Sequence, residues 1–180
     1  IPYYVLDYTE SFSEKVVDNF IDMYAQGLTP NPCVECNRSV KFDHFLKQAK
    51  ELNCDKVATG HYAKIIENEN NFELHKADYL DKDQSYVLHM LSSSTLEHVM
   101  FPLGTISKPE VRQIAADLGL KTAFKKDSQD ICFVGKKNYR NFVDKRIDIS
   151  TSGDIVDRDG STMGQHEGIH CLLYTSPSPR

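Results

Sequence analysis

Three cysteines are the residues of this sequence best suited to chemistry, and two of them form a pair. Cys33 and Cys36 make a C-x-x-C motif in the polar, proline-containing stretch 27–37, which the pattern predicts to be a loop just before a helix. Amides at a helix N-terminus stabilise a thiolate and lower the pKa of the thiol, which makes a cysteine there a competent nucleophile. Spacing alone leaves redox or nucleophilic chemistry, metal binding and a structural role open, because no second pair of zinc ligands follows.

Cys132 is the third of these residues and lies in a lysine-rich stretch. Residues 125–137 have the sequence KKDSQDICFVGKK, and cationic neighbours favour the thiolate form of a cysteine. An ordinary loop cysteine is the alternative at this position. Cys54, in contrast, lies on the run that leads into a buried strand, and we expect it to be a packed thiol.

Helices and strands alternate along the chain and must position these cysteines. Apolar residues recur at helical spacing over 13–26 and over 42–52, and a short strand at 56–59 ends in Gly60 and His61. The first residues, 1–7, have the apolar pattern of a buried strand. Strands separated by helices predict an α/β domain with a parallel sheet.

Turn and cap signals define the remaining elements. Residues 62–66 and 72–76 fit a β-hairpin across a polar turn. A capping box at 107–110 predicts the start of a helix that ends at Gly119. From residue 152 the pattern changes to a Gly-rich hairpin over 153–160, in which an Asp-Gly pair marks the turn.

The two ends suggest a piece of a longer protein. The chain opens on the predicted strand with no initiating Met, and 171–180 have no periodicity, so we interpret them as a non-native tail. We expect a domain boundary near Ile147, with 1–146 forming the main α/β domain and 147–170 the beginning of a β-rich domain.

Composition places the chain among ordinary globular proteins. Of its 180 residues, 40% are apolar and 26% are charged, and 21 Lys and Arg against 26 Asp and Glu give a net charge of −5. No apolar run approaches the ~18 residues of a membrane span, so we expect no membrane partner. Five cysteines without a secretory signal indicate a reducing compartment, and we expect the cytoplasm.

The acidic total hides a basic window around Cys132. Residues 121–146 contain eight Lys or Arg and three Asp or Glu, which is a local charge of +5. Phosphate backbones are bound by such clusters of Lys and Arg, although a solvated lysine-rich loop has the same composition. The net charge therefore does not exclude a nucleic-acid partner.

Four motifs occur in the order found in one enzyme family. They are TPNPCVECN at 29–37, ATGHY at 58–62, KDQSY at 82–86 and DSQDICF at 127–133, and shorter matches are FPLG at 101–104, DLGL at 117–120 and GQHEG at 164–168. Over about residues 1–170 the sequence resembles the tRNA-specific 2-thiouridylases, which exchange oxygen for sulfur at C2 of the wobble uridine. The resemblance implies a partial Rossmann-like domain of the adenine nucleotide alpha hydrolase (PP-loop) type, followed by a small central domain.

The resemblance also implies roles for individual residues. Cys132 would receive a persulfide sulfur from a donor protein, either a cysteine desulfurase or a sulfur-relay protein, and Cys36 would form a disulfide with Cys132 as the sulfur leaves. The implied cofactors are ATP and Mg²⁺, and the implied substrate is tRNA. The remaining contacts would be made to the flipped uridine by Asn31, Pro32 and Cys33, to the adenine nucleotide by Gly60, and to tRNA by His61, Lys82, Asp83 and Gln84.

Local structure offers plainer alternatives for two of these segments. Gly60 and His61 also fit a simple exit from a strand, where glycine permits the turn. Residues 82–84 also fit the polar cap of a helix that carries Tyr86, Val87 and Met90.

Two departures from the family pattern affect the expected mechanism. The family's phosphate loop, of the Ser-Gly-Gly-Val-Asp-Ser type, does not occur in this sequence and is expected upstream of Ile1. Many members have Asp where this chain has Cys33, so a carboxylate cannot serve in proton transfer here. In one alternative, Cys33, Cys36 and Cys132 hold three corners of a [4Fe–4S] cluster. In another, Cys33 and Cys36 form a non-catalytic redox or zinc-binding module.

Overall fold

The chain forms two compact units. The structure, a computed structural model, describes residues 2–69, 71–127, 131–134, 139–147 and 152–169. Residues 33–127 form one unit, called the central unit below, and residues 1–32 with 128–180 form the other, called the terminal unit. Within the described residues no helix is long and apolar enough to cross a membrane. The tail 171–180 lies outside the described residues, and the boundary near Ile147 stays a prediction.

A long helix opens the central unit. It runs without a break through α3 (Pro32–Glu35), the π-helical segment η2 (Cys36–His44) and α4 (Phe45–Glu51). Apolar residues form its buried face, and they are Val40, Phe42, Leu46 and Ala49. Phe42, Leu46 and Ala49 belong to the pattern predicted over 42–52, whereas Leu52, at the end of that pattern, is exposed.

The C-x-x-C motif lies in this helix, and the prediction of a loop over 27–37 is wrong for its second half. The helix begins at Pro32, so Cys33 lies in the first turn and Cys36 just after it. Proline suits the first helical position because its φ is already close to the helical value and its missing N–H would have had no partner there. The polar, proline-containing composition therefore marks the start of a helix here.

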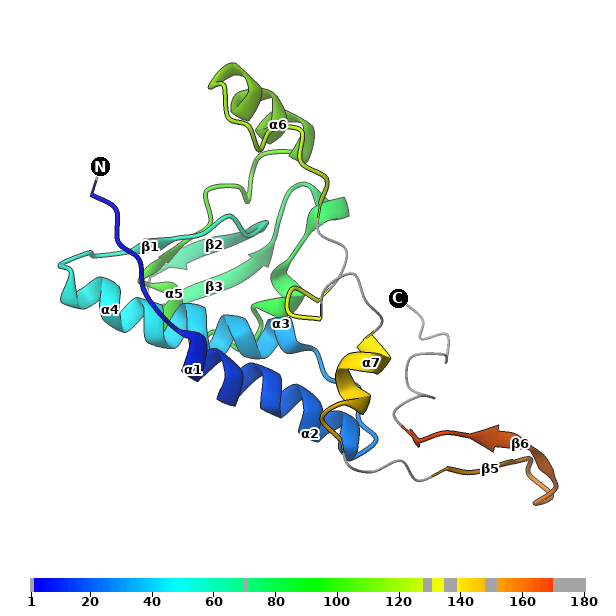
Figure 1. The fold of residues 1–180 in the computed structure, drawn as a ribbon. Helices are drawn as coiled ribbons and strands as arrows, with labels where there is room; N and C mark the ends of the chain where they lie inside the picture. The colour runs from blue at the N-terminus through cyan, green and yellow to red at the C-terminus, as the bar shows by residue number, and fades with distance from the viewer. Residues whose placement is uncertain (1, 70, 128–130, 135–138, 148–151, 170–180) are drawn as a thin grey trace. The chain divides into compact units, whose positions relative to one another are not determined.

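Two pairs of strands pack against this helix (Figure 1). Strands β1 (Val57–Ala58) and β4 (Val99–Met100) pair in parallel. Strands β2 (Ala63–Asn68) and β3 (Asn71–Lys76) form an antiparallel hairpin, as the sequence predicts. The parallel pairing and the helix against it confirm the α/β class.

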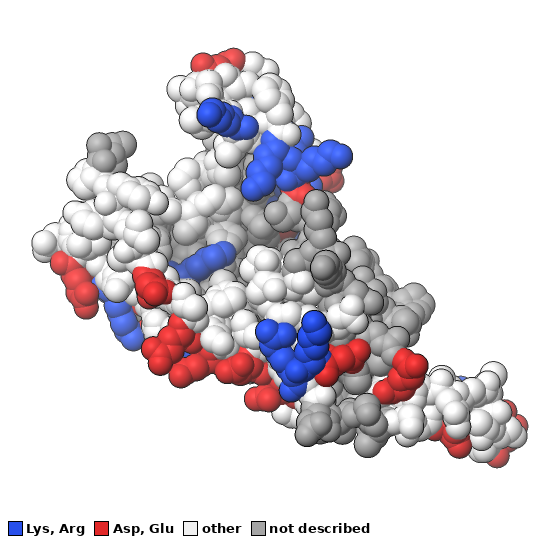
Figure 2. All heavy atoms as spheres, in the orientation of Figure 1, with Lys and Arg blue, Asp and Glu red and all other residues white. Residues whose placement is uncertain are grey.

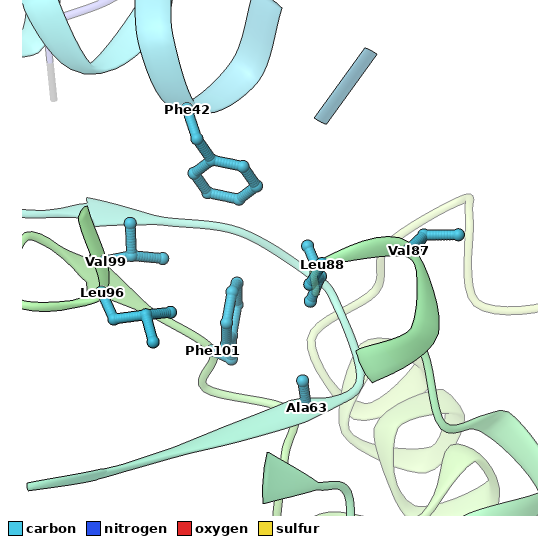
Figure 3. Close-up of a cluster of buried hydrophobic side chains, with 7 residues drawn as sticks. All are labelled: Phe42, Ala63, Val87, Leu88, Leu96, Val99 and Phe101. Carbon is cyan, nitrogen blue, oxygen red and sulfur yellow. The ribbon is translucent and has the colours of Figure 1, made fainter. Parts of the chain in front are cut away.

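One apolar cluster joins the helix to the strands. Phe42 points from η2 toward Phe101 and the strands (Figure 3), and the two rings meet edge to face with centroids 6.1 Å apart. Burial of a phenylalanine side chain contributes about 1.5–3 kcal/mol. The segments η4 (Ser85–Val87) and α5 (Ser93–Leu96) complete this cluster. Its buried members are Phe42, Ala63, Val87, Leu88, Leu96, Val99 and Phe101.

Short turns and a capped helix complete the central unit. The 3₁₀ turns η3 (Leu80–Lys82) and η4 occur where the alternative interpretation placed a helix with Tyr86 and Met90, and both of these side chains are exposed. Helix α6 (Lys108–Asp117) begins at the predicted capping box, in which Glu110 accepts a hydrogen bond from the Ser107 amide at 2.9 Å.

The terminal unit is built on a second long helix. Its elements are α1 (Thr9–Phe12), the π-helical segment η1 (Ser13–Asp18), α2 (Asn19–Ala25), α7 (Tyr139–Asp144) and the hairpin of β5 (Gly153–Val156) with β6 (Thr162–His166). The first helix begins at Thr9 rather than at residue 13, because the Asp7 carboxylate accepts hydrogen bonds from the Thr9 amide at 2.9 Å and from its hydroxyl at 2.6 Å. The apolar core of the terminal unit contains Phe20, Ile21 and Val143.

Two expectations about the chain's apolar segments are wrong. Residues 2–7 form no regular secondary structure, and Tyr3 and Val5 are 87% and 81% exposed. No described strand pairs with them, and a strand needs such a partner to satisfy its backbone. Cys54 is exposed rather than packed, because it lies between the turn at residues 52–53 and the start of β1 at Val57.

Gly104 allows a close backbone approach that no other residue permits. A Cβ at Gly104 would lie 2.1 Å from the carbonyl oxygen of Ala63, and that oxygen is fixed in the hairpin. We expect Gly104→Ala to lower the free energy of unfolding by about 3 kcal/mol, measured by urea denaturation. Gly60→Ala is the matched control, because its Cβ would lie 3.8 Å from Leu103. It should change stability by less than about 0.5 kcal/mol, and equal effects of the two substitutions would contradict the assignment.

Candidate functional site

The C-x-x-C motif is fixed by packing on one side and by hydrogen bonds within its own helix on another. Val34, between the two cysteines, packs against the apolar cluster of the central unit. On another side of the helix Glu35 accepts hydrogen bonds from Arg38 Nη2, at 2.8 Å, and from the Ser39 hydroxyl. Cys33 is exposed and Cys36 is half-buried. Residues three apart lie on the same side of a helix, so the two thiols belong to one face.

Asn37 connects this helix to Val87, the residue that follows the KDQSY motif. Its Nδ2 donates a hydrogen bond to the Val87 carbonyl at 3.0 Å, and the residue is 2% exposed. Its Oδ1 is buried and has no hydrogen-bond partner among the described residues. A buried hydrogen bond of this kind resists displacement because the freed amide would find no water. It therefore holds the cysteine helix against the turn η4.

Asp83 and Gln84 are used in internal hydrogen bonds. The Asp83 carboxylate accepts from the Ala77 amide at 2.8 Å and from the Ser85 hydroxyl at 2.6 Å. The Tyr62 amide donates to Gln84 Oε1 at 3.0 Å, and the Gln84 amide donates to the Tyr62 carbonyl at 2.8 Å. These bonds fix the motif beside the ATGHY segment. Contacts of Asp83 and Gln84 with tRNA stay predictions.

Lys82 belongs to a cluster of charges. Its Nζ lies 2.9 Å from Asp127, the first residue of the DSQDICF motif, and Lys108 and Arg112 approach the same carboxylate. The hydrogen bond from Lys82 is the main cause that lowers the pKa of the Asp127 carboxyl, and Lys108 adds to it. Sequence reasoning did not single out Lys108 and Arg112. Their spacing of four residues at the start of the capped helix was the available signal.

Gly60 lies just after the end of the parallel strand β1. It is exposed, and the space around its Cα would accept a methyl group, so packing within the chain does not require glycine here. Ligands of α/β proteins bind beyond the carboxyl ends of parallel strands, where loops leave backbone groups accessible. The position therefore fits a backbone contact with a nucleotide, as the resemblance implies.

His61 is a partly buried, neutral histidine. Its ring centroid lies 6.0 Å from those of both Phe42 and Phe101, and Nδ1 is 2.8 Å from the Thr59 hydroxyl oxygen. Burial is the main cause that lowers the pKa of His61 to about 4, and the positive charge of Lys41 adds to the effect. At neutral pH the ring can offer hydrogen bonds but no positive charge.

Cys132 lies at the tip of a tight turn in the terminal unit. Its neighbours Ile131 and Phe133 both pack against the apolar core of this unit, and the Val134 amide donates to the Ile131 carbonyl at 3.1 Å. The Phe133 ring meets that of Phe20 edge to face, with centroids 5.3 Å apart. Cys132 itself is exposed. The packed, partly buried neighbours thus hold the turn while its thiol stays accessible.

The three-cysteine hypotheses stay predictions. Cys33 and Cys36 belong to the central unit and Cys132 to the terminal unit. Among the residues that the structure describes, no group of three or more His, Cys, Asp or Glu side chains could hold a metal ion. Neither the pairing of Cys36 with Cys132 nor their ligation of a cluster with Cys33 is tested by this arrangement.

The pKa of His61 predicts acid destabilisation. Protonation favours the unfolded chain, where the pKa is near 6.5, so stability is complete above that pH and is lost as the pH falls toward 4. We expect a loss of about 1–2 kcal/mol, since water still reaches part of the ring. Urea denaturation at several pH values measures it, and His61→Asn should flatten the profile while His89→Asn, at an exposed site, should not. An NMR titration that placed the His61 pKa near 6.5 would contradict this account.

Comparison with known proteins agrees with the motifs. The model of the family described as the tRNA methyl transferase HUP domain matches residues 1–136. The tRNA-specific 2-thiouridylases MnmA of Rickettsia peacockii (strain Rustic) and Rickettsia prowazekii (strain Madrid E) are each 50% identical over 176 residues, and that of Rickettsia conorii (strain ATCC VR-613 / Malish 7) is 49% identical. These matches cover 97% of this chain and 47–49% of the relatives, so the chain spans about half the length of the curated relatives it matches. The resemblance to 2-thiouridylases is confirmed, and the chain belongs to the family of the tRNA methyl transferase HUP domain.

Proposed function

We propose that this chain is part of an enzyme that transfers sulfur to C2 of the wobble uridine of tRNA. Relatives named tRNA-specific 2-thiouridylase match 97% of the chain at about 50% identity. The structural observation that carries the proposal is the exposed thiol of Cys132, held on a turn between two packed neighbours. A sulfur carrier needs this combination, because a donor protein must reach the thiol while the thiol keeps a defined position.

Cys132 receives the sulfur in the first step. Its thiolate attacks the outer sulfur of a persulfide on the donor protein, a cysteine desulfurase or a sulfur-relay protein. The donor's S–S bond breaks, the donor thiolate leaves, and Cys132 becomes a persulfide. No net oxidation occurs, because one S–S bond replaces another. The exposure of Cys132 supports this step.

Cys36 releases the sulfur in the second step. The outer sulfur of the Cys132 persulfide attacks C2 of the uridine, and the adenylylated C2 oxygen departs as part of AMP. The Cys36 thiolate then attacks the Sγ of Cys132, so that a disulfide forms and the sulfur stays on C2. A thiol reductant returns the disulfide to two thiols. The half-buried place of Cys36 on a helix fixed by Val34 and Asn37 suits a partner that reacts with one defined sulfur.

The nucleotide and the base bind through other residues. ATP, with Mg²⁺, supplies the adenylyl group that turns the C2 oxygen into a leaving group, and Gly60 contacts the nucleotide through its backbone. Asn31, Pro32 and Cys33 line the pocket for the uridine, which must leave its stack to react. The neutral ring of His61 contributes a hydrogen bond to tRNA rather than a charge.

Substitution of single cysteines in the full-length protein tests the relay. We expect Cys132→Ser and Cys36→Ser each to reduce ATP-dependent thiolation of a tRNA transcript to background, because each removes a reacting sulfur. Cys54→Ser is the matched control, since Cys54 is also exposed, and it should keep full activity. Activity that survives Cys132→Ser would contradict the relay and favour a module built on Cys33 and Cys36.

Cys33→Ser separates the relay from the iron–sulfur alternative. In the relay Cys33 only lines the base pocket, so we expect partial activity and no iron in protein purified without oxygen. In a [4Fe–4S] site Cys33 is a ligand, so its loss would abolish both activity and the brown colour. Iron content and the visible spectrum of the two proteins measure the difference.

The 180-residue chain alone should not thiolate tRNA. Its sequence contains no Ser-Gly-Gly-Val-Asp-Ser type loop to hold the phosphates of ATP. We expect no product in an assay with ATP, a persulfide donor and a tRNA transcript, while the full-length protein gives product under the same conditions. ATP-dependent thiolation by the purified chain would show that this loop is not needed.

A further inference from the structure

A basic pocket of the central unit surrounds Lys82, and no role has been given above to its other residues. It has a volume of about 580 Å³, and the residues that matter here are Tyr79, Lys82, Lys108, Arg112, Phe124 and Asp127. We call it the Asp127 pocket. Figure 2 shows Lys and Arg side chains gathered beside α6, where this pocket lies.

Three cations share one carboxylate in this pocket. The Nζ of Lys82 lies 2.9 Å from Asp127, the Nζ of Lys108 3.4 Å and the Nη2 of Arg112 3.3 Å. The carboxylate neutralises one of the three charges, so the pocket keeps a net charge of about +2. Its ammonium and guanidinium groups also have more N–H donors than one carboxylate can accept. The site is therefore built for more negative charge than Asp127 supplies.

Tyr62 does not line the pocket, but it lies next to the lining residue Lys108 and has an unused hydrogen-bond donor. Tyr62 is 5% exposed, and its hydroxyl is buried with no partner among the described residues. Its ring lies under Lys108, whose Nζ is 5.5 Å from the centroid. Burial is the main cause that raises the pKa of Tyr62; the charge of Asp127 adds to it, while Arg112 and Lys82 act against it, and the hydroxyl keeps its proton. A buried hydroxyl without an acceptor costs stability that a bound anion would restore.

An exposed aromatic ring lies beside the cations. Phe124 is 86% exposed although it lines the pocket, and Tyr79 lines the same pocket. Free phosphate gains nothing from such a ring. Single-stranded nucleic acid does, because its bases stack on aromatic side chains while cations hold its backbone.

We propose that the Asp127 pocket binds a phosphate of single-stranded RNA, with the adjoining base on Phe124, and that the Asp127 carboxylate occupies the phosphate position when RNA is absent. When RNA binds, its phosphate replaces the Asp127 carboxylate as the anion that contacts Lys82, Lys108 and Arg112. The proposal rests on the proposed function only in taking the RNA to be tRNA. Free pyrophosphate shares the oxyanion chemistry, and the experiment separates it from RNA.

Binding of a labelled tRNA anticodon stem-loop to the 180-residue chain tests the proposal. Asp127→Asn keeps the size of the side chain and removes the competing charge, so affinity should rise about three- to tenfold. Arg112→Gln and Lys108→Gln should each weaken binding about tenfold and lower the slope of log K against log salt by about 0.7–1. Lys47→Gln is the matched control, because it removes one exposed cation that pairs with Asp43 outside the pocket. It should change affinity less than about twofold.

Two further variants test the hydroxyl and the ring. Tyr62→Phe should raise the melting temperature of the free chain and weaken RNA binding, since it removes a donor that only the ligand satisfies. A purely structural tyrosine would not combine these two effects. Phe124→Leu should weaken binding of the stem-loop about tenfold and leave binding of pyrophosphate unchanged.

Several results would overturn the proposal. Weaker binding by Asp127→Asn would show that the carboxylate does not compete with the ligand. Equal losses of RNA affinity in Arg112→Gln and Lys47→Gln would show that only the total charge of the chain matters. If Asp127→Asn bound no RNA, the pocket would not be an RNA site. Pyrophosphate that binds as tightly as the stem-loop, with Phe124→Leu silent, would make this a free-phosphate site. Thiolation by the full-length protein is measured separately, so failure of the proposed function does not imitate any of these results.

Discussion

The burial of Phe42 against Phe101 and the strands is the interaction on which the candidate site depends. It fixes the helix that carries Cys33 and Cys36, and the same two rings enclose His61, which follows β1. Hydrogen bonds then extend this frame outward, from Asn37 to Val87 and from Gln84 to Tyr62. Three of the sequence motifs are thus placed by one core. Asn37, Asp83 and Gln84 in these motifs form hydrogen bonds within the chain. Cys33, Gly60 and Lys82 keep atoms that a ligand can reach.

Local signals in the sequence predicted much of this frame. The hairpin of β2 and β3 and the capped helix α6 follow from alternation, a polar turn and a capping box, all of which act within a few residues. The C-x-x-C was harder to place, because Pro32 suits both a loop and the first turn of a helix. Residues 2–7 were wrongly expected to form a strand, since apolar residues do not reveal whether a partner strand exists.

The candidate site was predictable only in part, for a similar reason. The resemblance singled out Lys82, but Lys108 and Arg112 approach it only because the turn η3, helix α6 and Asp127 come together in the folded chain. The unpartnered Tyr62 hydroxyl is likewise a property of the packed core. The net charge of −5 gave no sign of this pocket, because electrostatic recognition depends on where charges gather.

In the proposed reaction Cys132 carries sulfur and Cys36 releases it. Mass spectrometry of peptides from the full-length protein tests this most directly, after incubation with a persulfide donor and then with ATP and tRNA. We expect a mass gain of one sulfur atom on the peptide that contains Cys132, followed by a disulfide between Cys36 and Cys132 once tRNA is thiolated. Sulfur on Cys33 or Cys36 instead, or thiolated tRNA without that disulfide, would contradict it.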